Sequence, residues 1–138
     1  MNIEEIVDNF CLFEDWEDRY RYLIDLGSRL PPMEETLKTE ETKVRGCMSQ
    51  VWMVMGWEKD RDGNNRLSLF ADSDAQIVKG LIAVLHTIFQ DKRAAEIEAI
   101  DIDQIFSRLG LDQHLSPNRR NGFYAMVERI RSFTAGCK

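Results

Sequence analysis

Cys47 is the residue of this chain best suited to chemistry, and it lies in the stretch VRGCMSQVW, residues 44–52. Gly46, directly before it, permits backbone angles that other residues avoid, as in a tight loop. Ser49 and Gln50 are polar, so the cysteine does not belong to a continuous apolar run. These neighbours favour a thiol that is presented on a loop.

Charge near Cys47 also affects its reactivity. Lys43 and Arg45 place positive charge close by in sequence, which favours the thiolate, the nucleophilic form of the side chain. The alternative is a buried cysteine that packs as a small apolar side chain. The residues alone leave both interpretations open, and they name no reaction for a reactive Cys47.

Asp72, Ser73 and Asp74 are a second group of candidates. Two carboxylates so close together suit acid–base catalysis, but the same residues also suit the start of a helix, where they cap backbone N–H groups. We interpret them first as helix-capping residues. His86 is expected near the core on an apolar helical face, and His114 has no cysteine or acid at ligand spacing, so no metal site is predicted.

Composition restricts the class of protein. The chain has 138 residues, of which 43% are hydrophobic and 30% charged, and a formal net charge of -6. These values predict one globular domain over residues 1–138. The negative charge disfavours nucleic acid and anionic membranes as partners. Two small arginine groups, Arg119–Arg120 and Arg129 with Arg131, are too few to reverse this and are interpreted as surface or partner-contact charges.

The cysteines Cys11, Cys47 and Cys137 show neither CxxC spacing nor ligand spacing with the histidines. We therefore expect free thiols, no structural disulfide and a reducing, cytoplasmic location. The first residues lack a basic region followed by an apolar one, so no secretory signal is expected. No apolar run approaches about 20 residues, so no membrane span is expected.

Helices and a small sheet must position these residues. Apolar residues at helical spacing and capping residues predict helix starts at Ile3, Asp15, Ser73 (with Gln76), Asp101 (with Gln104) and Ser116, with Gly110 ending the fourth helix. A glycine inside the third helix, Gly80, predicts close packing, which we expect beneath the cysteine loop.

Strands are predicted on both sides of a turn at residues 62–65, in 51–60 and 66–73. Val44–Arg45 is predicted as a further short strand, and the charged stretch 33–43 as a solvated loop. The predicted fold class is therefore α+β, a small antiparallel three-stranded sheet flanked by helices.

Four stretches, taken together, resemble one protein family. The segment VRGCMSQVW resembles the cysteine-loop signature of the SufE family, GCxSxVW, and residues 16–31, 72–85 and 113–122 are similar to its N-terminal helix and its second and third blocks. The likeness runs nearly from end to end, in order and with family-like spacing. It implies a SufE/NifU-like fold.

Membership in this family implies a role in sulfur transfer. Such proteins accept sulfur from a pyridoxal-phosphate (PLP)-dependent cysteine desulfurase of the SufS or CsdA type, stimulate it, and pass the sulfur on to iron–sulfur cluster assembly, where a scaffold protein is a further candidate partner. The family's acceptor cysteine aligns with Cys47, whereas Cys11 and Cys137 lie outside the shared motifs. The resemblance implies no cofactor on this chain, since the PLP belongs to the desulfurase.

The residues around the acceptor are candidates for shaping the loop or contacting the partner: Arg45, Gly46, Met48, Ser49, Gln50, Trp52, Asp72, Ser73, Asp74, Lys79 and Arg119. Met48 departs from many relatives, which carry glutamine there, and this bears on loop shape or partner contact. A stand-alone thiol-dependent enzyme of the peroxidase or hydrolase type remains the alternative function. The choice between a SufE-type and a CsdE-type role, and between a monomer and a weak homodimer, stays open.

Overall fold

The computed structural model describes residues 2–46 and 49–136. The predictions made for Cys47, Met48 and Cys137 therefore lie outside the described residues. The elements are α1 (Ile3–Leu12), α2 (Trp16–Ser28), the 3-10 turn η1 (Glu35–Leu37), β1 (Val51–Lys59), β2 (Asn65–Ser73), α3 (Gln76–Phe89), α4 (Ala94–Ala99), α5 (Ile102–Arg108), α6 (Leu111–His114) and α7 (Pro117–Ala135). None of the helices in this part of the chain is long and apolar enough to cross a membrane.

The predicted α+β class is confirmed, with one correction to the sheet. β1 and β2 pair antiparallel from Val51 opposite Ser73 to Lys59 opposite Asn65. The predicted third strand at Val44–Arg45 is wrong: within the described residues, only an isolated bridge between Lys43 and Trp52 adds to the sheet. The pairing cannot continue, because Gly46 has a φ of 92°, outside the range of a strand.

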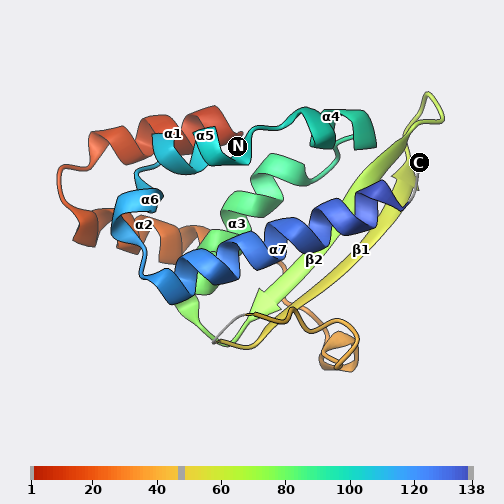
Figure 1. Ribbon diagram of the computed structural model, residues 1–138, viewed down its shortest axis with the longest axis horizontal. Coiled ribbons are helices and arrows are strands. Elements are labelled where there is room, and N and C mark those ends of the chain that lie inside the picture. Colours follow the sequence, from red (N-terminus) through yellow and green to blue (C-terminus); the bar gives the residue numbers. More distant parts are fainter. Residues whose placement is uncertain (1, 47–48, 137–138) are drawn as a thin grey trace.

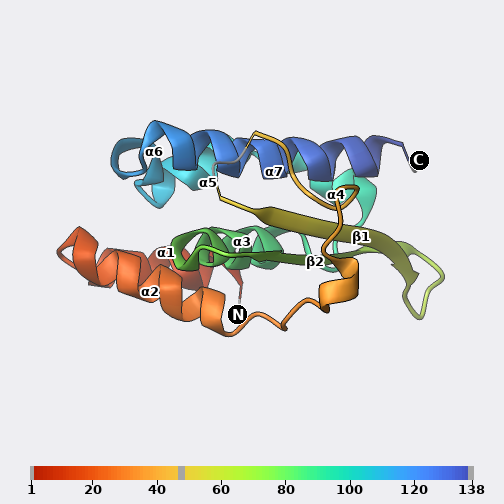
Figure 2. The same cartoon turned by 90° about the horizontal axis from the view of Figure 1, so that it is seen from below.

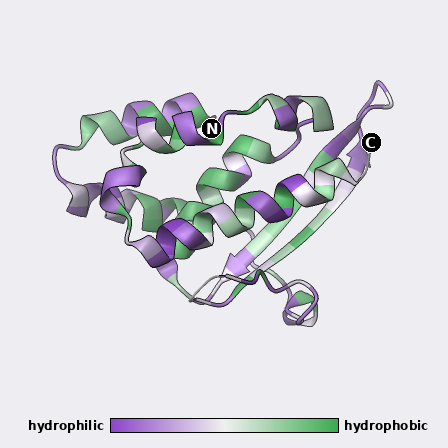
Figure 3. Ribbon diagram, viewed as in Figure 1, coloured by the Kyte–Doolittle hydropathy of each residue, from purple (hydrophilic) through white to green (hydrophobic). Residues whose placement is uncertain are grey.

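Helix α3 is the centre of the fold. It contacts α1, α2, β2 and α7, and Figure 2 shows α7 on one side of it and α2 on the other. Figure 3 shows that α3 is coloured as apolar over most of its length. Its buried residues are Val78, Gly80, Leu81, Ile82, Ala83, Val84, Leu85, Ile88 and Phe89. In Figure 1 the β1–β2 hairpin runs diagonally past the C-terminal half of α7, where Trp57 stacks on Phe133 with ring centroids 5.7 Å apart.

Two glycines let α2 and α3 approach closely. A Cβ added to Gly80 would lie 2.4 Å from the Leu23 carbonyl oxygen, and one added to Gly27 would lie 2.6 Å from the Gly80 nitrogen. The predicted close packing at Gly80 is confirmed, but its close neighbour is Leu23 of α2 and not the cysteine loop.

Helix capping follows the sequence in two of three places. The Asp101 side chain accepts the Gln104 N–H at 3.2 Å, and the Ser116 hydroxyl accepts the Arg119 N–H at 3.3 Å. Gly110, with a φ of 73°, follows the end of α5 as predicted.

The predicted cap of α3 at Ser73 is wrong. Ser73 is still part of β2, opposite Val51, and the residue before the helix is Ala75, whose N–H donates to the Ser73 hydroxyl at 3.2 Å. Strand pairing therefore takes precedence over the local capping preference. The short elements η1, α4 and α6 were not predicted.

Candidate functional site

Two backbone hydrogen bonds join the segment before the cysteine loop to strand β1, which follows the loop. Before the loop, Val44 is buried and its N–H donates to the Val51 carbonyl at 2.8 Å. One step further along β1, the Met53 N–H donates to the Thr42 carbonyl at 2.8 Å. Residues 42–44 are thus held against the edge of β1. We call residues 41–46 the first arm of the cysteine loop.

Helix α7 holds the first arm of the loop from the other side. Arg129 donates from Nη1 to the Lys43 carbonyl at 2.8 Å and from Nη2 to the Glu41 carbonyl at 2.5 Å. A Cβ on Gly46 would contact the Ala125 side chain at 3.5 Å. Arg129 was interpreted from the sequence as a surface or partner-contact charge, and no sequence signal reveals its contact, because the acceptors are backbone carbonyls.

The last residue of the loop is tied to the segment before α3. The Gln50 N–H donates to the Asp74 carboxylate at 3.1 Å, and the Asp74 N–H donates to the Gln50 carbonyl at 3.2 Å. This reciprocal pair joins residues that are far apart in sequence. Asp74 is therefore next to the loop, and its structural role is to fasten the loop's end.

Asp72 lies at the centre of a charged cluster beside the loop. It is opposite Trp52 in the sheet and 8% exposed. Its carboxylate lies 3.4 Å from the Lys38 Nζ and 3.5 Å from the Lys79 Nζ, and it accepts the Ser73 N–H at 2.8 Å. Burial raises the pKa of Asp72, but the Ser73 hydrogen bond and the two lysines outweigh it, so the pKa is lowered overall. Asp72 is thus a paired carboxylate, poorly suited to exchanging protons near neutral pH.

Lys38 lies in the stretch predicted as a solvated loop, and it is not among the predicted site residues. Its ammonium lies over the Trp52 ring, 5.1 Å from the centroid. A hydrogen bond to Glu35, supported by Asp72, raises its pKa. Lys38 therefore attaches the segment around η1 to the sheet next to the cysteine loop.

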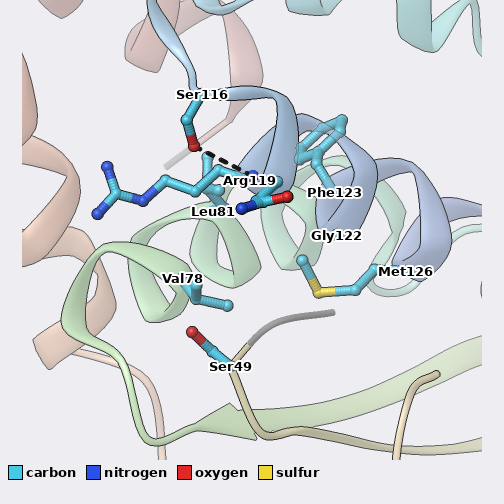
Figure 4. A pocket seen from close by; sticks show the side chains of 9 residues that line it. Ser49, Val78, Leu81, Ser116, Arg119, Gly122, Phe123 and Met126 are labelled. Atoms are coloured by element: carbon cyan, nitrogen blue, oxygen red, sulfur yellow. Dashed lines mark hydrogen bonds between the residues drawn. The ribbon is translucent and has the colours of Figure 1, made fainter. Parts of the chain in front are cut away.

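A cavity of about 410 Å³ opens between α3 and α7 beside the loop. Figure 4 shows Ser49 and Val78 at one end of it and Ser116 and Arg119 at the other. It is lined by Ser49, Val78, Leu81, Ser116, Asn118, Arg119, Gly122, Phe123 and Met126. Its interior is apolar and its rim polar, an arrangement common in small-molecule and group-binding sites.

Two predicted arginines lie near the loop on different sides. Arg119 is exposed at the rim of the 410 Å³ cavity and forms no ion pair with any described residue. Arg45 is exposed on the first arm, where it lines a smaller hollow of about 250 Å³ with Glu40 and Lys43. The structure therefore brings the described members of the predicted set close to the two ends of the loop, while their functional roles stay predictions.

The histidines lie elsewhere. The His114 ring stacks on Trp16, with centroids 3.9 Å apart, and does not line the cavity. His86, near the other end of α3 from Asp74, is half-buried, and burial lowers its pKa against the opposing effect of Asp91. Among residues 2–46 and 49–136, no group of three or more His, Cys, Asp or Glu side chains is arranged to hold a metal ion.

The sequence is 46% identical over 135 residues to an uncharacterized SufE-like protein of Rhizobium meliloti (strain 1021), covering 98% of this chain and 96% of that protein. It is 47% identical over 130 residues to an uncharacterized SufE-like protein of Rhizobium etli, covering 94% of this chain and 87% of that protein.

A solved structure supports the fold. The solution structure of a hypothetical protein from Thermus thermophilus superposes with a TM-score of 0.71, covering 97% of this chain and 93% of that one, at 17% identity. The sequence model of the SufE family, described as the Fe-S metabolism associated domain, matches residues 4–134. The chain therefore belongs to the SufE family, whose domain is associated with iron–sulfur metabolism.

Proposed function

We propose that this protein accepts sulfur on Cys47 from a PLP-dependent cysteine desulfurase, stimulates that enzyme, and delivers the sulfur to iron–sulfur cluster assembly. Membership in the SufE family supports the association with iron–sulfur metabolism. The observation that carries the proposal is the apolar cavity between α3 and α7, which opens beside Ser49, two residues after Cys47.

The proposed step is a sulfur exchange without net oxidation. The desulfurase holds sulfur as a persulfide on its own cysteine, and the Cys47 thiolate attacks the outer sulfur atom. A new S–S bond forms to Cys47, the bond to the desulfurase sulfur breaks, and the desulfurase cysteine leaves as a thiolate. As in thiol–disulfide exchange, the thiolate fraction, the leaving group and access to the sulfur set the rate.

The cavity suits the product of this step. A persulfide is readily lost to reductants and oxidants, so its carrier benefits from a partly apolar recess that limits its contact with solvent. Cys47 is bonded directly to Gly46 and lies two residues before Ser49, which keeps it within reach of the cavity at about 3.8 Å per residue. The volume of about 410 Å³ leaves ample room for a side chain with one additional sulfur atom.

The alternative of a stand-alone thiol enzyme is less well supported. A thiol hydrolase pairs its cysteine with a histidine, but His114 stacks on Trp16 and His86 lies towards the other end of α3. In the proposed reaction the PLP stays on the desulfurase, and this chain needs no cofactor of its own. Cys11 is exposed and free.

Intact-mass analysis tests the proposal. The protein is mixed with a cysteine desulfurase, PLP and cysteine without reductant, and its mass is measured. Wild type should gain the mass of sulfur, Cys47→Ser should not, and the matched controls Cys11→Ser and Cys137→Ser should load normally. Equal loading of Cys47→Ser would refute the proposal, whereas peroxide consumption without a desulfurase would favour the enzyme alternative.

A further inference from the structure

We infer that Arg129 is a positioning residue for sulfur transfer: by tying the first arm of the cysteine loop to α7, it sets the rate at which Cys47 takes sulfur. The inference rests on the proposed function. It assigns Arg129 a role different from the surface or partner-contact charge that the sequence indicates.

Arg129 donates two hydrogen bonds to the backbone of the first arm. Its two Nη groups reach two carbonyls of the arm, those of Glu41 and Lys43, at 2.5 and 2.8 Å. It forms no ion pair with any described residue, so these carbonyls are where its guanidinium donates. A planar guanidinium can hold two acceptors at once in a fixed geometry, which the single ammonium group of a lysine cannot reproduce.

Arg129 lies on the same face of α7 as residues that contact the arm and line the cavity. Ala125, four residues earlier, faces Gly46, and Met126, three residues earlier, lines the cavity. Residues three and four apart lie on one face of a helix. One face of α7 therefore contacts the arm before Cys47 and also lines the cavity. Arg129 fixes the position of the arm against this face.

Apart from Arg129, the arm is held by the buried side chain of Val44 and by its backbone pairing with β1. Its pairing with β1 amounts to an isolated bridge with two backbone hydrogen bonds, Val44 to Val51 and Met53 to Thr42. The pair of Gln50 and Asp74 fastens the opposite end of the loop to the segment before α3 and not to α7. Without Arg129, the arm keeps its attachment to β1 but loses its polar attachment to α7.

Sulfur transfer needs the attacking thiolate in line with the partner's S–S bond. Misplacing a reacting group by about 1 Å costs up to about 100-fold in rate. We therefore expect Arg129→Met to slow persulfide formation on Cys47 by about tenfold or more, with Arg129→Lys intermediate. Methionine keeps an apolar stem in place of the arginine stem, so the packing of α7 is largely preserved.

The test compares Arg129→Met and Arg129→Lys with a matched control, Arg131→Met, whose guanidinium pairs only loosely with Glu128 at 3.9 Å. Desulfurase turnover is measured against increasing concentration of each variant. A positioning role lowers the maximal rate and leaves the half-saturating concentration near the wild-type value. Arg131→Met should match wild type.

Hydrogen exchange separates positioning from general destabilisation. In Arg129→Met, the amides of Val44 and Met53 should exchange at least about tenfold faster, since the loss of even one charged hydrogen bond is worth about that factor. The amides of α3, such as Leu85, should not change. Equal acceleration throughout the core, or a raised half-saturating concentration at unchanged maximal rate, would overturn the inference. If wild type itself gains no sulfur, the proposed function fails. If wild type and Arg129→Met load at the same rate, only the inference fails.

Discussion

Replacing Gly80 by alanine should destabilise the protein by forcing α2 and α3 apart. The added Cβ would lie 2.4 Å from the Leu23 carbonyl oxygen and 2.6 Å from its carbonyl carbon. Both are backbone atoms of a helix and cannot rotate away. The whole α2–α3 contact must therefore open, and the buried side chains beside it lose part of their dispersion energy.

The magnitude follows from two opposing effects. Overpacking of a core costs up to about 3 kcal/mol, and a clash with helix backbone places this site at the upper end. Alanine is the better helix former by about 1 kcal/mol. The expected loss is therefore about 2 kcal/mol, which for a chain of this length lowers Tm by roughly 6–10 °C.

Thermal and urea unfolding followed by circular dichroism measure this loss. Gly56→Ala is the matched control, since a Cβ there meets no atom within 4 Å, and its stability should stay within about 0.5 kcal/mol of wild type. Gly27→Ala forces the same contact open from the other helix, so the double variant should cost less than the sum of the two single variants. A Gly80→Ala protein as stable as Gly56→Ala would refute the reasoning.

Three further predictions concern the site and its surroundings. Asp74→Ala should speed amide exchange at Gln50 by about tenfold through loss of the hydrogen bond, while Asp74→Asn, which keeps an acceptor oxygen, should not; equal exchange in both would contradict this. Because folding lowers the pKa of Asp72, its contribution to stability is present above its unfolded pKa of about 3.9 and is lost as pH falls through the lower folded value. The free energy of unfolding, measured with urea at several pH values, should therefore fall less steeply on acidification in Asp72→Asn than in wild type. An equally steep fall would argue against the ion pairs. Ser49→Leu should narrow the cavity and slow sulfur loading by about tenfold with little change in Tm, whereas Ser49→Ala should load normally; normal loading of Ser49→Leu would separate the cavity from the reaction.

Local chemistry made several elements predictable. Asp101 and Ser116 cap their helices through their own side chains, and Gly110 adopts the left-handed backbone that ends α5. These effects involve residues within about one turn of each other. For the same reason the sequence was misleading at Ser73, whose capping preference competes with strand pairing to Val51, a partner that is distant along the chain.

The candidate site divides in the same way. The amino-acid sequence alone was enough to predict the α+β class and the unusual backbone of Gly46, because these depend on residue type and on short spacings. The choice of Cys47 rests on the family resemblance and stays a prediction. Only the tertiary structure shows the hydrogen bonds from Arg129 to the first arm, the contacts of Lys38 with Asp72 and Trp52, and the cavity between α3 and α7. The reason is physical. Every residue has a backbone carbonyl, so the sequence does not show which carbonyls a guanidinium binds. A cavity of this kind exists only where helices distant in sequence meet.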